Sequence, residues 1–161
     1  MQVMTTLDLL RHGEARGAAA GGDAARPLTL HGTQAVERLG RHLASLGWRP
    51  ALAFASPLLR ARQTAALVLL SAQVPLTPEP LAELAPDAEP SELLTVLAGL
   101  GVADTHVLLV GHQPLLGDLV TWCTGGDAAA ITPGQLVRIM FAGAPARGGG
   151  AVSLALRPEA M

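Results

Sequence analysis

The chain alternates between short, continuous apolar runs and longer stretches in which apolar residues recur every three or four positions. The continuous runs predict buried strands at residues 3–10, 51–55 and 105–110. Near the end of the chain, residues 136–141 and 151–156 flank a loop rich in Gly and Pro, and they predict an edge hairpin. These runs are the candidate strands of a sheet.

The stretches with helical periodicity lie between the predicted strands. The first begins after Thr29, whose hydroxyl is a suitable N-cap. Ser56 and Pro57 predict the start of a second helix, because Ser can cap and Pro lacks the N–H that would be unsatisfied in the first turn. Two further helices are predicted after a cap at Ser91 and after Pro114.

Strands that alternate with helices predict right-handed crossovers and a mostly parallel sheet covered by helices on both faces. We therefore expect an α/β fold, a three-layer α/β/α sandwich with the edge hairpin near the C-terminus. The length matches one domain, so residues 1–161 are expected to form a single domain. Residues 75–90 are rich in Pro and irregular, with a candidate short strand at 81–84.

The composition narrows the function classes. Half of the residues are hydrophobic and only 15% are charged, which indicates a folded globule. Two Trp, two Phe and no Tyr leave few stacking platforms for single-stranded nucleic acid, and a net charge of −2 offers no general attraction to nucleic acid or membranes. With Cys123 as the single cysteine and no apolar run of membrane-spanning length, we expect a cytoplasmic protein.

Candidate chemistry lies where the first strand ends, at Arg11, His12 and Gly13. Ligands of open α/β sheets bind at the carboxyl ends of the strands, and Gly13 allows a sharp turn and a close approach of the backbone to a ligand. A neutral imidazole is a nucleophile toward phosphorus, and a guanidinium can hold two phosphate oxygens. The tripeptide alone is also typical of a turn with a solvated histidine, so phosphoryl transfer through His12 needs further support.

Two other strand ends supply that support. Arg60 lies in the first turns of the helix after the second strand, where free backbone N–H groups favour an anion. Arg62 points to nearly the opposite side, so only one of these arginines can face the site. His112 follows another strand, although such a residue is also typical of an ordinary loop. Parallel strands share one carboxyl edge, so we expect Arg60 and His112 to converge with the Arg-His-Gly turn.

Several segments, taken in order, resemble the motifs of one family. They are Leu-Leu-Arg-His-Gly-Glu at 9–14, Ser-Pro-Leu-Leu-Arg-Ala-Arg-Gln-Thr-Ala at 56–65 and Val-Gly-His-Gln-Pro at 110–114. They resemble the histidine phosphatase superfamily, also called phosphoglycerate mutase-like. The short length and Arg-Pro-Leu-Thr-Leu-His-Gly-Thr-Gln-Ala at 26–35 look most like its SixA branch of protein phosphohistidine phosphatases. The resemblance extends from Val3 to about Arg157.

The resemblance implies a phosphoglycerate mutase-like fold and a role for each residue. His12 would attack phosphorus and become a phosphohistidine, while Arg11, Arg60 and His112 would bind the phosphate oxygens. It implies neither a metal nor a cofactor. The partner would be a phosphohistidine-bearing protein or a small phosphorylated substrate.

The sequence is less specific about the general acid and the substrate. Many members of the superfamily use a carboxylate to protonate the leaving oxygen; Glu83 matches that region loosely, with Asp87 as second choice, and an isolated Glu83 is also typical of a surface. The chain is too short for large lid insertions, which favours a pocket open to a protein-bound phosphohistidine. A small-molecule phosphomonoesterase and a non-catalytic phosphate-binding module stay open as alternatives.

Three further features lie outside the motifs. Asp8 is a lone carboxylate in a predicted buried strand, which calls for an edge position or a pairing with a nearby arginine. The Gly/Ala-rich segment 15–25 predicts a flexible loop that could cover the site in part. His106, inside its strand, is expected to be structural.

Overall fold

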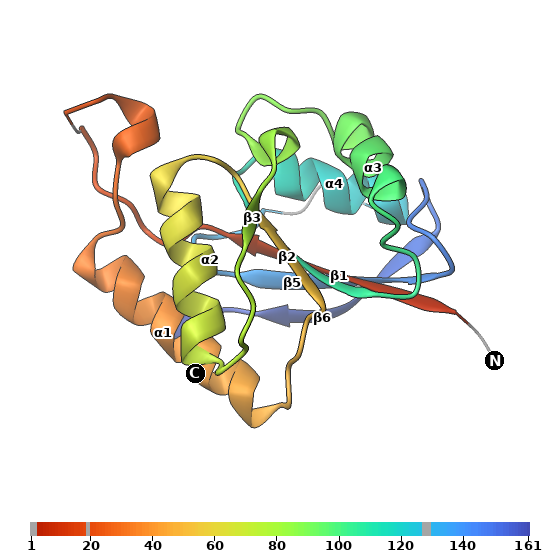
Figure 1. The fold of residues 1–161 in the computed structure, drawn as a ribbon, viewed down its shortest axis with the longest axis horizontal. Coiled ribbons are helices and arrows are strands. Elements are labelled where there is room, and N and C mark those ends of the chain that lie inside the picture. Colours follow the sequence, from red (N-terminus) through yellow and green to blue (C-terminus); the bar gives the residue numbers. More distant parts are fainter. Residues whose placement is uncertain (1–2, 19, 127–129) are drawn as a thin grey trace.

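A mixed six-stranded sheet forms the centre of the computed structural model, which describes residues 3–18, 20–126 and 130–161 (Figure 1). Within these residues the strands lie in the order β3-β2-β4-β1-β5-β6. Their bounds are β1 (Met4–Arg11), β2 (Leu52–Ala55), β3 (Glu79–Pro80), β4 (His106–Gly111), β5 (Leu136–Ala142) and β6 (Gly150–Leu156).

The direction of the strands confirms a mostly parallel sheet with an edge hairpin. Neighbouring strands from β3 to β1 are parallel, whereas β5 pairs antiparallel with both β1 and β6. In the central pair, Arg11 at the end of β1 lies opposite Gly111 at the end of β4. The carboxyl ends of these strands therefore open on one edge, and the residues that follow them are brought together.

Helices cover both faces of the sheet, as expected for a three-layer sandwich (Figure 1). In the described residues the α-helices are α1 (Leu30–Ser45), α2 (Leu59–Ser71), α3 (Pro90–Gly99) and α4 (Leu115–Thr124). Leu10 and Val110 point to a core shared with α1 and α2, whereas Leu9 and Leu109 point to one shared with α3 and α4. Strand alternation thus divides the large apolar side chains between two cores.

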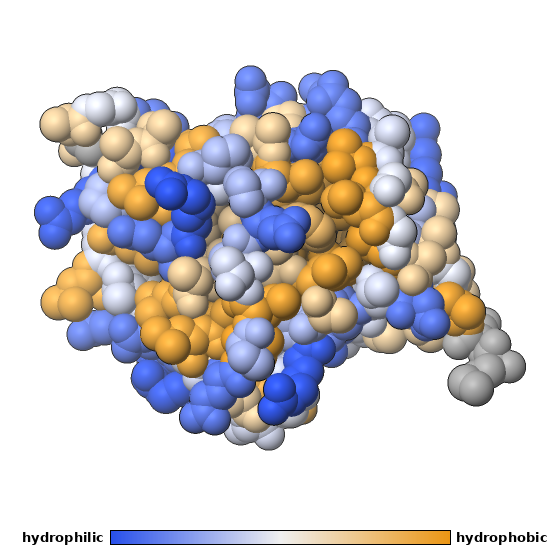
Figure 2. All heavy atoms as spheres, viewed as in Figure 1, coloured by the Kyte–Doolittle hydropathy of each residue, from blue (hydrophilic) through white to orange (hydrophobic). Residues whose placement is uncertain are grey.

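On the surface, apolar and hydrophilic side chains are interspersed over the face that Figure 2 shows. Leu30 and Leu70 are among the most exposed large apolar residues, at 72% and 76%. None of the helices in the described residues combines the length and the apolar character that crossing a membrane requires.

The residues predicted to cap the helix starts are confirmed for α1 and wrong for α2 and α3. Thr29 is the N-cap of α1, and its hydroxyl accepts from the N–H of Gly32 at 2.9 Å, as predicted. The prediction that Ser56 and Pro57 open α2 is wrong, because the helix begins at Leu59 with Leu58 as its N-cap; the Ser56 hydroxyl accepts from the Leu58 N–H at 3.3 Å and lies 2.8 Å from His112 Nε2. Ser91 is likewise not a cap, since Pro90 already occupies the first position of α3.

The predicted strand at 81–84 is also wrong. The segment that joins the sheet is β3, which lies directly before residue 81 in the chain. Its two residues lie at the edge of the sheet, where Pro80 is tolerated because its missing N–H would face outward. Ala82–Leu84 forms a 3-10 helix, η2, in which Leu84 is fully buried and Glu83 half-buried. A run of four residues is too short for its apolar pattern to distinguish a strand from a helical turn.

Asp8 lies in a central strand, and the pairing with an arginine accounts for it. Its carboxylate accepts from Arg138 Nε at 2.8 Å, from His106 Nε2 at 2.5 Å and from Trp48 Nε1 at 2.7 Å. Burial disfavours the ionised form, but the hydrogen bonds from His106 and Arg138 outweigh it and hold the pKa of Asp8 below its usual value. His106 therefore has the structural role expected of it.

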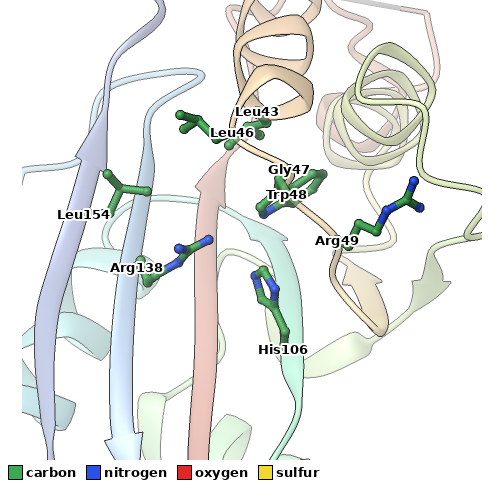
Figure 3. A pocket seen from close by; sticks show the side chains of 8 residues that line it. All are labelled: Leu43, Leu46, Gly47, Trp48, Arg49, His106, Arg138 and Leu154. Atoms are coloured by element: carbon green, nitrogen blue, oxygen red, sulfur yellow. The ribbon is translucent and has the colours of Figure 1, made fainter.

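These three partners of Asp8 also line a pocket of about 260 Å³ (Figure 3). Trp48 comes from the segment after α1, His106 from the amino end of β4, and Arg138 from β5. His112, by contrast, follows the carboxyl end of β4. The pocket is therefore separate from the strand ends where the sequence predicts chemistry.

Candidate active site

The turn after β1 presents His12 at the carboxyl edge of the sheet. The backbone N–H of His12 still donates to Gly111 of β4 at 3.0 Å, which continues the pairing one residue past the strand. Gly13 then passes so close to α1 that a Cβ would lie 3.0 Å from Val36 and 3.1 Å from the Gly32 carbonyl. Glycine is needed here for its small volume, because the turn packs against the start of that helix.

The tautomer of His12 follows from its hydrogen bond. Nδ1 lies 2.7 Å from the carbonyl oxygen of Gly13, and because a carbonyl only accepts, Nδ1 must carry the proton. Nε2 therefore carries the lone pair. Burial and the nearby charges of Arg60 and Arg11 lower the pKa of His12 to about 4, against the bond to Gly13, so the ring is neutral at physiological pH.

Arg60 is brought to this turn by the first turn of α2. Thr64, one helical turn later, donates to the Arg60 carbonyl at 2.8 Å and accepts from the N–H of Gly13 at 3.1 Å. Arg60 is buried, with 5% of its surface exposed, whereas Arg62 is exposed. Of the two arginines in this motif, Arg60 is thus the one next to His12.

His112 completes the cluster from the end of β4. Its ring centroid lies 5.1 Å from that of His12, and its Nε2 lies 2.8 Å from the hydroxyl of Ser56, the residue after β2. Burial first, and then the charges of His12 and Arg60, lower the pKa of His112 to about 3. This ring is also neutral at physiological pH, and Ser56 holds it in place.

Three nitrogens of this cluster are buried without a hydrogen-bond partner in the described part of the chain. They are Nε of Arg11, Nε of Arg60 and Nδ1 of His112. Buried polar groups in folded proteins are normally paired, so such a set calls for a ligand. Arg11 meanwhile anchors one amino group on the Ile131 carbonyl at 2.9 Å. Two guanidinium donors and an imidazole, all polar and water-excluded, suit a tetrahedral oxyanion.

The loop 15–25, described except for residue 19, contributes a residue that the sequence analysis did not single out. The carbonyl of Asp23 accepts from one amino group of Arg60 at 2.9 Å, and its carboxylate lies 3.2 Å from the other. Arg26 donates to the same carboxylate at 2.8 Å. The available signal was the position of Asp23, three residues before the Arg-Pro-Leu-Thr segment.

Glu83 and Asp87 are less well placed. The η2 helix does reach the carboxyl edge, since a Cβ on Gly111 would lie 3.4 Å from the Leu84 carbonyl. Within the described residues, however, neither carboxylate forms a hydrogen bond or ion pair with the four cluster residues. No group of three or more His, Cys, Asp or Glu side chains in that same part of the chain is arranged to hold a metal ion.

Known proteins resemble both the sequence and the fold. The profile of the histidine phosphatase superfamily (branch 1) matches residues 7–85. Phosphohistidine phosphatase SixA of Escherichia coli (strain K12) is 34% identical over 135 residues, which cover 81% of this chain and 82% of that protein. A solved structure of the protein histidine phosphatase SixA complexed with tungstate is 28% identical, has a TM-score of 0.85, and matches over 96% of this chain and 98% of that one.

The same architecture extends to a more distant enzyme. Phosphoglycerate mutase from Bacillus anthracis str. Sterne, at 18% identity, has a TM-score of 0.71 over 93% of this chain and 92% of that one. That likeness concerns the fold, which is phosphoglycerate mutase-like as expected. The profile match and the SixA matches place the chain in the histidine phosphatase superfamily, on its SixA-type branch of phosphatases.

Proposed function

We propose that this phosphatase works through a covalent phosphohistidine on His12, without a metal ion, and that it removes phosphoryl groups from phosphohistidine on a partner protein. One observation carries the proposal: a neutral imidazole with its lone pair on Nε2 lies beside three buried, unpartnered nitrogens. Such an arrangement places a candidate nucleophile beside buried polar groups that an anion can pair with.

The geometry supports each proposed step. Nε2 of His12 forms a bond to phosphorus while the bond to the leaving group breaks and its electron pair departs with that group. Arg11, Arg60 and His112 stabilise the charge on the phosphoryl oxygens. The phosphorylated ring keeps its proton on Nδ1, which still donates to the Gly13 carbonyl. Water then forms a bond to phosphorus, Nε2 recovers its electron pair, and inorganic phosphate leaves.

Phosphohistidine as the substrate is supported by the chemistry of its leaving group. An imidazole can be protonated before the P–N bond breaks, so this substrate makes little demand on a general acid. Within the described residues, neither Glu83 nor Asp87 bonds to the cluster, which fits that substrate. The similarity to SixA, a protein named as a phosphohistidine phosphatase, points the same way. A cytoplasmic partner fits a chain with one buried cysteine.

Glu83 remains our candidate proton donor for phosphate esters, whose alkoxide leaving group needs a proton. We expect Glu83→Gln to lower the rate with phenyl phosphate by about 10²-fold and to leave the rate with phosphohistidine nearly unchanged. The pH–rate profiles of both substrates measure this. An unchanged profile with the ester would remove Glu83 from the mechanism.

The decisive experiment traps the intermediate. A histidine phosphotransfer domain carrying labelled phosphate is mixed with the protein under rapid quench, and alkaline-stable label on His12 is expected. His12→Ala should bind the domain yet retain no label. Small sugar and nucleotide phosphates run in parallel; faster turnover of these would favour a small-molecule phosphomonoesterase, and native protein without label would favour a phosphate-binding module. Activity lost to a chelator would contradict a metal-free mechanism.

A further inference from the structure

Asp23 holds Arg60 by one edge of its guanidinium. The Asp23 carbonyl accepts a hydrogen bond from one amino nitrogen at 2.9 Å, and its carboxylate accepts one from the other at 3.2 Å. A guanidinium has five N–H donors, so these two bonds leave Nε–H and a neighbouring N–H free on the adjacent edge. That Nε is the buried nitrogen without a partner in the described structure.

The free edge is the one that suits phosphate. Two parallel N–H groups on Nε and a neighbouring nitrogen match two oxygens of a phosphoryl group in a fork. Asp23 therefore does not compete with the anion for this edge of Arg60, because it binds the adjacent, outer edge formed by the two amino nitrogens. Its own side chain is 61% exposed, at the rim of the cluster, while that of Arg60 is 7% exposed.

Asp23 is itself held in place. Arg26 donates to its other carboxylate oxygen at 2.8 Å and, through Nε, to the carbonyl of Arg16 at 2.6 Å. The base of the loop is closed by a bond from the Arg16 N–H to the Pro27 carbonyl at 2.8 Å. The hydrogen bonds from Arg26 and then Arg60 also keep the pKa of Asp23 below its usual value, so it stays ionised.

We propose that Asp23 is a positioning residue, which turns the Nε edge of Arg60 toward the phosphoryl group and supplies the counter-charge that this buried arginine otherwise lacks. The inference rests on the proposed function for its substrate. It makes the loop 15–25 part of the site through Arg60, without contact between Asp23 and the reacting atoms.

The test measures tungstate affinity by calorimetry and kcat/KM with N-phosphoimidazole. Asp23→Asn should weaken tungstate binding and lower kcat/KM by about 10- to 100-fold, the range for a hydrogen bond to a charged group. In an Arg60→Lys background, which has no fork to orient, the same change should alter either quantity less than about twofold. Glu37→Gln, which breaks the Glu37–Arg41 pair on α1, removes an equal charge and should change neither.

Several outcomes would overturn the inference. Tighter or unchanged tungstate binding in Asp23→Asn would show that Asp23 competes with the anion or is idle. An equal loss in both backgrounds would show that it does not act through Arg60. Asp23→Glu, which keeps the charge and moves it outward, should fall between the native protein and Asp23→Asn.

The two proposals can fail separately. A native protein that turns over normally while Asp23→Asn is unaffected would leave the proposed function intact and remove this inference. A native protein that never labels His12, but loses tungstate affinity in Asp23→Asn, would do the reverse.

Discussion

Two groups of histidine and arginine side chains lie along the same pair of strands, β1 and β4, and they differ in their counter-charge. Midway along β1, Asp8 lies at the centre of the first group and accepts from His106 and Arg138. At the carboxyl ends, the second group contains His12, His112 and Arg60; among the described residues its carboxylate is Asp23, which lies at the rim on Arg60 and not between the two imidazoles. The same residue types therefore give a closed ion pair in one place and a site that needs an anion in the other.

The two groups also differ in how fully their buried polar atoms are hydrogen-bonded. Around Asp8, four donated bonds satisfy a fully buried carboxylate. Around His12, three buried nitrogens have no partner in the described structure. A satisfied buried network stabilises the fold, whereas an unsatisfied one costs stability and is kept where a ligand completes it. The following predictions test that division, from the largest expected effect to the smallest.

Arg60→Lys should lower kcat/KM by about 10³-fold with little change in stability. Lysine keeps the charge but presents no planar fork, and removing a transition-state arginine costs about 10³–10⁵ in other phosphoryl-transfer enzymes. Steady-state kinetics with phosphorylated histidine substrate measure the loss, and urea unfolding checks the stability. A decrease below tenfold would mean that charge alone is enough at this position.

Asp8→Asn should destabilise the fold by about 3–5 kcal/mol, since it removes the buried charge that the half-buried Arg138 and His106 are paired with. The measurement is the free energy of unfolding in urea, with Glu37→Gln as a surface ion-pair control expected to cost at most about 1 kcal/mol. Activity per folded molecule should stay close to native. A loss of activity without a loss of stability would mean that the two groups are not separate.

The same variant also has a pH signature. Because the folded pKa of Asp8 lies below its unfolded value, its stabilisation is full above the ordinary carboxyl pKa and is lost as pH falls through the folded one. The free energy of unfolding of the native protein should therefore fall more steeply on acidification below about pH 4 than that of Asp8→Asn. Parallel slopes would contradict the lowered pKa.

The smallest effect concerns the titration of His12. Its ring should protonate near pH 4, below the ordinary value of 6.5, because burial and the charges of Arg60 and Arg11 disfavour the cation. The Cε1–H chemical shift followed by NMR from pH 3 to 8 measures the midpoint, and near-ultraviolet circular dichroism confirms that the fold persists. A midpoint near 6.5 would mean that the ring is solvated and that the site is not closed to water.

Much of this arrangement was readable from the chain. Continuous apolar runs located β1, β2 and β4, and the shared carboxyl edge of parallel strands correctly brought together residues as distant as His12 and His112. Helical geometry indicated that only one of Arg60 and Arg62 can face the site, and Arg60 is the buried one. These predictions hold because burial and periodicity are local properties that a sheet then combines in a fixed way.

Other contacts depend on long-range packing, which periodicity does not encode. Ser56 is a residue type that often caps helices, yet its hydroxyl also pairs with His112, a residue of another strand end. Asp23 lies in a segment without any periodic pattern, so nothing local assigns it to Arg60. At 81–84, a short run with leucine at both ends made a 3-10 turn resemble a strand.

The hydroxyl of Thr64 has a consequence for the reaction coordinate. By donating to the Arg60 carbonyl and accepting from the Gly13 N–H, it links the turn that carries the proposed nucleophile to the helix that carries Arg60. This link fixes the position of the His12 turn relative to α2. Small losses of alignment between reacting groups are costly in rate, so the Thr64 hydroxyl is expected to help maintain a near-attack geometry.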